Sequence, residues 1–157
     1  MDHWKYVIAI REKAKVGPKG FQQLLLSFGS VENVFKASIE DLSSLPRINA
    51  QKAEQLLRSQ EEFREIENHI SYLEELGVGI STILDDNYPE MLRQINDPPP
   101  LLYYRGDFPL NYPSFAAVVG THREYSSWGI NLAVQIGKYL ARRGVVVVSG
   151  LAEGIDS

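Results

Sequence analysis

The chain has 157 residues, no cysteine and a formal net charge of −4. Hydrophobic residues make up 44% and charged residues 23%, which is typical of a soluble globular protein. The lack of cysteine excludes a disulfide scaffold, a thiolate zinc site and a cysteine nucleophile. No apolar run approaches the roughly 18 residues that a membrane helix needs, so the sequence predicts a cytoplasmic protein with no membrane partner.

The first part of the chain is predicted to be entirely helical. A short helix is expected over residues 3–12, and Pro18 suits the first turn of the next helix because its missing N–H would have no partner there. Gly29 is expected to end that helix and Ser30 to cap the following one. Ser38 is expected to open another short helix.

A long helix is predicted over residues 50–76, because its apolar residues recur in steps of three and four and mark one buried face. Gly77 is expected to stop it. The sequence therefore predicts a helical domain over residues 1–76.

Two turns in this domain are typical of helix-hairpin-helix units, which offer backbone N–H groups to a DNA phosphate without reading bases. Val16-Gly17-Pro18-Lys19-Gly20 matches well, and Lys15, Gly17 and Lys19 are candidate secondary DNA contacts. Leu45-Pro46-Arg47-Ile48-Asn49 matches poorly, because Arg47 and Asn49 stand where glycines would let the backbone approach. A purely structural hairpin explains that second turn at least as well.

The net charge hides a basic N-terminal end. Lys5, Arg11, Lys13, Lys15 and Lys19 are accompanied there only by two acidic residues, Asp2 and Glu12. Such a cluster can follow a row of phosphates. A solvated helix end is an equally good interpretation.

Residues 77–157 show the pattern of an α/β domain. A continuous apolar run starts at Phe115, an amphipathic helix is expected over residues 130–143, and a second apolar strand covers residues 145–148. Strand, helix and strand in this order form a βαβ unit. Three shorter elements are expected before it: a strand over 78–84, a helix over 90–95 and a strand over 101–105. The predicted class is therefore α/β, with the helical domain followed by an incomplete Rossmann-like parallel sheet.

The loop after the first βαβ strand is a candidate anion site. A loop between a parallel strand and a helix N-terminus presents free N–H groups and the positive end of the helix dipole. Gly120 allows close approach, while Thr121, His122 and Arg123 add polar donors. Ser126 and Ser127 would either cap the helix or donate to a phosphate. Neither the G-x-G-x-x-G nor the Walker A pattern is present.

The second candidate loop follows the second strand. Adjacent strand ends of a doubly wound sheet open on a shared crevice, so this loop is expected beside the first one. Its candidate phosphate-binding residues are Gly150, Leu151, Ala152 and Gly154. Asp156 is interpreted as a helix cap rather than as a catalytic residue.

The sequence offers no catalytic or metal-binding constellation. His3, His69 and His122 are scattered, and none has a partner at metal-ligand spacing. No nucleophile stands in a defensible arrangement with a base. We therefore expect no enzymatic activity, no metal and no cofactor.

Taken together, the motifs resemble the DprA/Smf family of DNA-processing proteins over nearly the whole chain. The most specific stretch is Asp86–Gly106, which is similar to the family's YP-x-x-L, D-P-P and L-Y-x-R-G motifs in the same order. Residues 120–123 with Trp128-Gly129 resemble its G-[ST]-R…YG loop, and Ser149–Asp156 resembles its S-G-L-A-x-G-I-D motif. His122 is inserted before Arg123, and Trp128 replaces the usual tyrosine.

The resemblance implies a bacterial protein that binds single-stranded DNA and helps to load the RecA recombinase in natural transformation. It also implies that the full-length parent is a homodimer and that phosphates bind in a basic pocket around residues 120–123. Because the chain ends where a further helix is expected, we interpret it as a fragment. One alternative is a nucleotide phosphoribohydrolase of the lysine-decarboxylase-like (LOG) type; another is a fragment with no independent activity.

Overall fold

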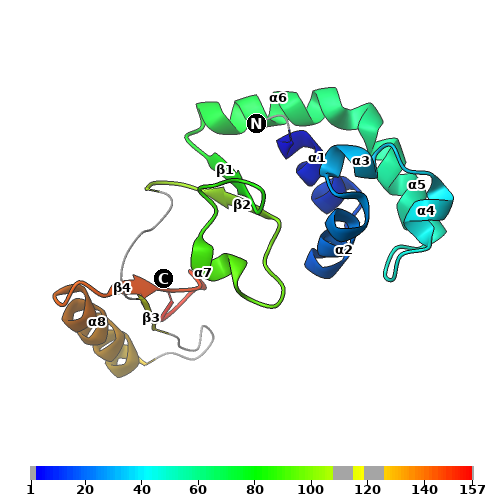
Figure 1. The fold of residues 1–157 in the computed structure, drawn as a ribbon. Helices are drawn as coiled ribbons and strands as arrows, with labels where there is room; N and C mark the ends of the chain where they lie inside the picture. The colour runs from blue at the N-terminus through cyan, green and yellow to red at the C-terminus, as the bar shows by residue number, and fades with distance from the viewer. Residues whose placement is uncertain (1–2, 108–114, 119–125, 157) are drawn as a thin grey trace. The chain divides into compact units, whose positions relative to one another are not determined.

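The computed structural model describes residues 3–107, 115–118 and 126–156, and the chain divides into two compact units (Figure 1). Unit 1 spans Met1–Pro109 and unit 2 spans Leu110–Ser157. The helices of unit 1 are α1 (Trp4–Ile8), η1 (Ala9–Lys13), α2 (Pro18–Phe28), α3 (Val31–Val34), α4 (Ile39–Ser43), α5 (Ala50–Arg58), η2 (Ser59–Glu62), α6 (Phe63–Glu75) and α7 (Glu90–Arg93). Its strands are β1 (Gly79–Thr82) and β2 (Leu101–Tyr104).

Local residues set the starts of three helices in unit 1, and the end of one of them, as predicted. Pro18 is the first residue of α2, and Gly29 ends that helix with φ +78°, in the left-handed region that glycine adopts most readily. The Ser30 hydroxyl accepts the Asn33 N–H at 3.2 Å and begins α3. Ser38 and Asp41 form a reciprocal capping box on α4.

The prediction of one continuous helix over residues 50–76 is wrong. The 3₁₀ turn η2 separates α5 from α6, and it begins at the buried Ser59. The Ser59 hydroxyl donates to the Leu56 carbonyl oxygen at 2.6 Å, while the Gln60 amide donates to the carbonyl oxygens of Leu57 and Phe35. These bonds hold the tighter turn, and Leu56 and Ile66 on either side of it both remain in the core.

The core of unit 1 joins the helices to the first two strands. Residues Val7 to Ile10 are almost fully buried at its centre, together with side chains from α2 to α6. Ile80 of β1 belongs to the same apolar cluster. Strands β1 and β2 pair antiparallel, from Gly79 opposite Tyr104 to Thr82 opposite Leu101. Helix α6 runs along one side of this unit, beside α1 (Figure 1).

Unit 2 contains β3 (Phe115–Ala117), α8 (Ser127–Ala141) and β4 (Val146–Val148). Strands β3 and β4 pair in parallel, with Ala116 opposite Val147, and α8 makes the connection between them. The helix starts three residues earlier than predicted, because Ser126 caps it by accepting the Gly129 N–H at 3.1 Å. The predicted class, a helical N-terminal region followed by a parallel α/β unit, is confirmed.

Within the described ranges, no helix is both long enough and apolar enough to cross a membrane.

Candidate nucleic-acid interface

The first predicted loop is only partly covered by the structure. Gly120, Thr121, His122 and Arg123 lie outside the described residues. The structure describes the residues that follow them, Ser126 and Ser127, at the start of α8. The Ser126 oxygen is engaged as the helix cap, whereas Ser127 is the first helical residue and is exposed.

The second predicted loop follows β4 and folds back on itself. The Ser149 hydroxyl donates to the Asp156 carbonyl oxygen at 2.6 Å, which closes residues 149–156 into a compact turn. Leu151 and Gly154 adopt positive φ values of 54° and 115°. Leu151 is the most exposed large side chain of this unit, at 82% exposure. The turn therefore holds its backbone at the surface in a conformation that costs a non-glycine residue free energy.

The second loop lies against the start of α8, whereas the first loop, beside which it was predicted to lie, is outside the described residues. A methyl group added at Gly129 would lie 3.4 Å from the Ile155 side chain and 3.4 Å from the Ser126 hydroxyl oxygen. A hollow of about 210 Å³ lies between α8, the two strands and this loop. Its walls are mainly apolar, from Val118, Ile130 and Val147, with Ser149 and Asp156 at the loop side. The polar side chains that line the hollow, those of Ser149 and Asp156, therefore both come from the second loop.

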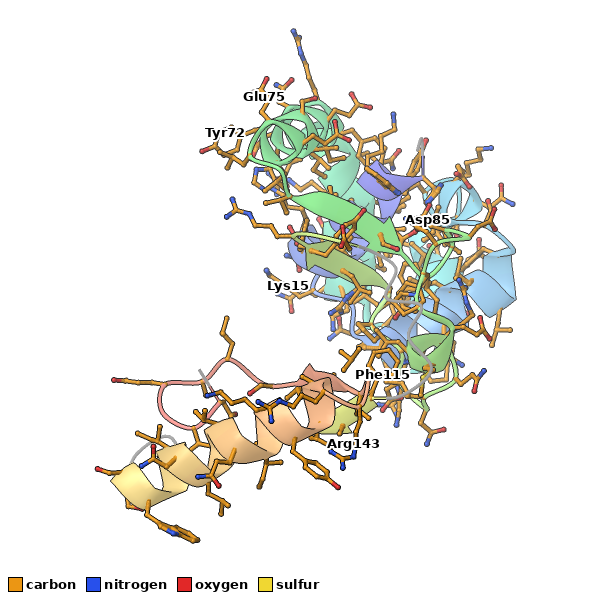
Figure 2. All side chains as sticks on the ribbon, turned by 90° about the vertical axis from the view of Figure 1, so that its left-hand side faces the viewer. Lys15, Tyr72, Glu75, Asp85, Phe115 and Arg143 are labelled. Carbon is orange, nitrogen blue, oxygen red and sulfur yellow. The ribbon has the colours of Figure 1, made fainter. Side chains whose placement is uncertain are left out.

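The first hairpin lies in unit 1 between η1 and α2. Lys15 is exposed on the surface of this unit and has φ +51° (Figure 2). Gly17 is the N-cap residue of α2, with an ordinary φ of −71° and with open space where a side chain would project. Lys19 forms an ion pair with Asp97, with the ammonium nitrogen 3.4 Å from the carboxylate oxygen. Lys15, Gly17 and Lys19 thus lie on one turn, as the sequence indicated.

The second hairpin repeats the backbone conformation of the first. The matching positions differ from those that the sequences of the two turns indicated. Arg47 has φ +73°, Ile48 is buried and Asn49 is the N-cap of α5. In the first hairpin Lys15 has positive φ, Val16 is buried and Gly17 is the N-cap of α2. Arg47 therefore corresponds to Lys15, and a basic residue takes the left-handed position in both turns. The repeated order of basic, aliphatic and capping residues was the available signal.

Both hairpins line one hollow of about 430 Å³. It is bounded by residues 16–20 of the first hairpin, by Arg47 and Lys52 of the second, and by Asp97 from the segment after α7. Arg47 and Lys52 were absent from the sequence-based candidates. The hollow brings three cationic side chains and one carboxylate together in unit 1.

Much of the predicted basic N-terminal end is neutralised by acidic residues of η2 and α6. Lys5 pairs with Glu67 at 2.6 Å, and Lys13 pairs with Glu62 at 2.5 Å and Glu65 at 3.4 Å. The hydrogen bond to Glu62 raises the pKa of Lys13 above its ordinary 10.5, against a smaller opposing effect of burial. These two lysines stabilise helix packing, so the interpretation as a row of free cations fails for them.

No group of three or more potential metal ligands occurs among the residues that the structure covers. Each described buried side-chain polar atom has a hydrogen-bond partner.

Two family profiles match this chain. The profile of the family described as "DNA recombination-mediator protein A" matches residues 79–157, about half of the chain. The profile described as "SAM-like Helix-hairpin-helix tandem" matches residues 14–61, which include both hairpins.

Individual relatives agree with the family profiles. The chain is 37% identical over 83 residues to "DNA processing protein DprA" of Bacillus subtilis, covering 52% of this chain and 28% of the relative. It is 29% identical over 160 residues to "Protein Smf" of Synechocystis, covering 97% of this chain and 39% of the relative. The solved structure of DNA processing protein A (DprA) from Streptococcus pneumoniae matches with a TM-score of 0.64 and 28% identity, over 97% of this chain and 50% of that one. The chain thus spans half or less of each relative's length.

Proposed function

Because this chain belongs to the DNA recombination-mediator protein A family, we propose that it binds single-stranded DNA and assists the loading of RecA recombinase during recombination and natural transformation. The observation that carries the proposal is the family match over residues 79–157, which include both strand-end loops. The names of the relatives, as DNA-processing proteins, support the same class of substrate.

The proposed binding residues follow β3 and β4 in the chain. We propose that Gly120, Thr121, His122 and Arg123 contact phosphates, together with Ser126 and Ser127. The second loop contributes the remaining proposed contacts: Gly150, Leu151, Ala152 and Gly154. The closeness of Ile155 to Gly129 supports this arrangement, because a methyl group added at Gly129 would lie 3.4 Å from the Ile155 side chain. Lys15, Gly17 and Lys19 are the proposed secondary contacts.

We propose that the chain has two domains, a helical domain over residues 1–76 and a DNA-binding domain over residues 77–157. The family match that begins at residue 79 supports it. In space, β1 and β2 pack with the helices in unit 1, so the sequence domain and the compact unit have different limits.

The binding proposal is tested with Arg123→Gln in the full chain, measured by fluorescence anisotropy with a labelled single strand. Binding should weaken similarly for all base sequences, and the slope of log affinity against log salt should fall by about 0.7, the value for one phosphate contact on a single strand. The matched control is Arg142→Gln, which removes the same charge at the far end of α8. Equal affinities for the two variants would contradict the proposed site.

The recombinase, dimer and non-enzyme proposals need separate measurements. RecA loading is checked by the rate of RecA filament assembly on protein-coated single strands, with and without this chain. Homodimerisation, which we propose from the resemblance to the family, is checked by sedimentation. We propose that the chain has no catalytic activity. Release of a free base from nucleoside monophosphates would contradict this proposal and would favour the phosphoribohydrolase alternative. The proposed cytoplasmic location is checked by cell fractionation.

A further inference from the structure

We propose that the hollow between the two hairpins of unit 1 binds a nucleic-acid backbone phosphate through Lys19, Arg47 and Lys52. We further propose that Asp97 takes the place of that phosphate at Lys19 in the free chain. The choice of ligand rests on the proposed function, whereas the site itself is separate from the loops of unit 2.

The charges that line the hollow favour an anion. Lys19, Arg47 and Lys52 carry three positive charges, and Asp97 is the one acidic residue among the lining residues. This excess lies in a chain of overall charge −4, so it does not follow from composition. In the described part of the chain, the side chains of Arg47 and Lys52 have no ion-pair partner, in contrast to Lys5 and Lys13.

The backbone around the hollow is shaped for close approach. The fold does not require a glycine at position 17. Its φ of −71° is one that any residue adopts, and a methyl group added there would meet nothing within 4 Å. Its lack of a side chain therefore leaves the wall of the hollow open. Arg47 is held at φ +73°, where a residue with a Cβ is strained. A phosphodiester exposes two oxygens that share one negative charge. Such a group fits a wall of backbone and cationic side chains better than a bulky or apolar ligand does.

Asp97 already forms the type of contact that a phosphate would make. Its carboxylate oxygen lies 3.4 Å from the Lys19 ammonium nitrogen, and the two side chains are 45% and 53% exposed. An ion pair this exposed is weak and easily exchanged for another anion. Asp97 precedes Pro98, Pro99 and Pro100, which limit the backbone freedom of this segment. The carboxylate is therefore a built-in competitor for the site.

The experiment uses the full 157-residue chain and compares two charge-neutralising double variants. Arg47→Gln with Lys52→Gln removes two cations of the hollow and keeps a Cβ at the positive-φ position. Lys36→Gln with Arg64→Gln removes the same charge from exposed positions of unit 1 outside the hollow. Binding is measured by anisotropy with a labelled single strand and with a duplex of the same sequence, and with inorganic phosphate as the competitor.

We expect the hollow variant to bind roughly tenfold more weakly than the control variant. Its salt slope should fall by about 1.4 on a single strand or about 1.8 on a duplex, the values for two phosphate contacts. The loss of affinity should be larger for the duplex if the hollow binds phosphates of a duplex. It should be larger for the single strand if the hollow binds phosphates of a single strand. Competition by inorganic phosphate alone, with no change in either DNA affinity, would assign the hollow to free phosphate and overturn the DNA assignment.

Asp97→Asn provides a gain-of-function test that misfolding cannot imitate. Removing the competing carboxylate should tighten binding severalfold in the parent chain and should have no effect when Arg47 and Lys52 are already neutralised. Unchanged binding by Asp97→Asn would overturn the competitor role. Equal binding by the hollow and control variants would overturn the site. If only Arg123→Gln weakens binding, the proposed site in unit 2 stands and the hollow assignment fails. If only the hollow variant weakens binding, the hollow assignment stands and the proposed site in unit 2 fails.

Discussion

The two units of this chain have similar helix and strand patterns of apolar residues but differ in how well these residues are packed. Unit 1 has a core of almost fully buried apolar residues, which includes Phe21, Leu24 and Leu56. None of the described residues of unit 2 is buried, although Leu132, Ile136 and Val147 follow regular helix and strand patterns. Local patterns therefore form helices and strands in both units, but only unit 1 surrounds its elements with other elements.

This difference follows from the kind of element that each unit contains. Helices can cover one another, and each of those in unit 1 needs only one apolar face to be covered. A parallel sheet is normally covered on both faces and extended by further strands. With two strands of three residues and one helix, unit 2 leaves large apolar side chains in water. Its stability is therefore expected to be far lower than that of unit 1.

The largest expected effect is a difference in hydrogen exchange between the units. Amides in the core helices of unit 1 should be protected about a thousandfold or more over those of β3 and β4, because they exchange only by cooperative unfolding. Mass-spectrometric exchange of the full chain measures both at once. Equal protection of Val146–Val148 and of α2 in a monomer would abolish the contrast between the units.

The same contrast is expected from matched core substitutions. Leu24→Ala removes a side chain that is 1% exposed and should lower the free energy of unfolding by about 2–5 kcal/mol. Leu132→Ala removes one that is 38% exposed and should cost less than about 1 kcal/mol. Urea denaturation followed by circular dichroism checks both values. A similar loss for the two variants would indicate that unit 2 is packed more tightly than its exposure indicates.

Acid should destabilise unit 1 through Asp85, which joins the N-terminal helix to the turn after β1 (Figure 2). Burial raises the pKa of Asp85, but hydrogen bonds from Thr82 and Trp4 and the charge of His3 outweigh it, so the pKa is lowered overall. Because the folded-state pKa lies below the ordinary 3.8, this stabilisation is present above pH 3.8 and is lost as the pH falls further.

The substitution Asp85→Asn should remove about 1.5–3 kcal/mol at neutral pH, the usual contribution of hydrogen bonds to a charged group, and should flatten the acid dependence. Trp4 fluorescence is the measurement, because the Trp4 indole N–H donates to Asp85 at 3.0 Å. Trp128, the other tryptophan, is 73% exposed and should change little. An unchanged acid transition in the variant would show that other carboxyl groups control it.

The smallest expected effects have opposite signs in the two units. Alanine is favoured over glycine inside a helix by about 1 kcal/mol. Gly137→Ala in α8 meets nothing within 4 Å and should stabilise by about 0.5–1 kcal/mol. Gly20→Ala in α2 places a methyl group 2.8 Å from the buried Val16 side chain and should destabilise by about 1–2 kcal/mol. Thermal unfolding checks the pair, and stabilisation by Gly20→Ala would mean that the hairpin relaxes freely.

Helix starts could be predicted from the sequence because capping is local. Pro18, Ser30 and Ser38 act within three residues of their own positions. The break at Ser59–Glu62 could not be predicted, because the apolar spacing continues across it and Gln60 bonds to the Phe35 carbonyl oxygen from a different helix.

The same limit explains which parts of the candidate sites were found. Lys15, Gly17 and Lys19 are neighbours in the sequence, so their joint position on one turn was predictable. The partners Asp97 for Lys19 and Glu62 for Lys13 come from distant segments that only the fold brings close. Arg47 was discounted because a glycine at that position would let the backbone approach a phosphate. Its positive φ, which matches that of Lys15, is visible only in the structure.

The central position of α1 has a consequence for the synthesis of this protein. Val7 to Ile10 leave the ribosome before Ile66 and Ile80, which are needed to complete the cluster around them. His3 and Trp4 also bond to Thr82 and Asp85, about 80 residues later. These apolar residues therefore cannot be completely covered until residues 80–85 have emerged, and a nascent chain that still exposes part of them is a target for chaperones.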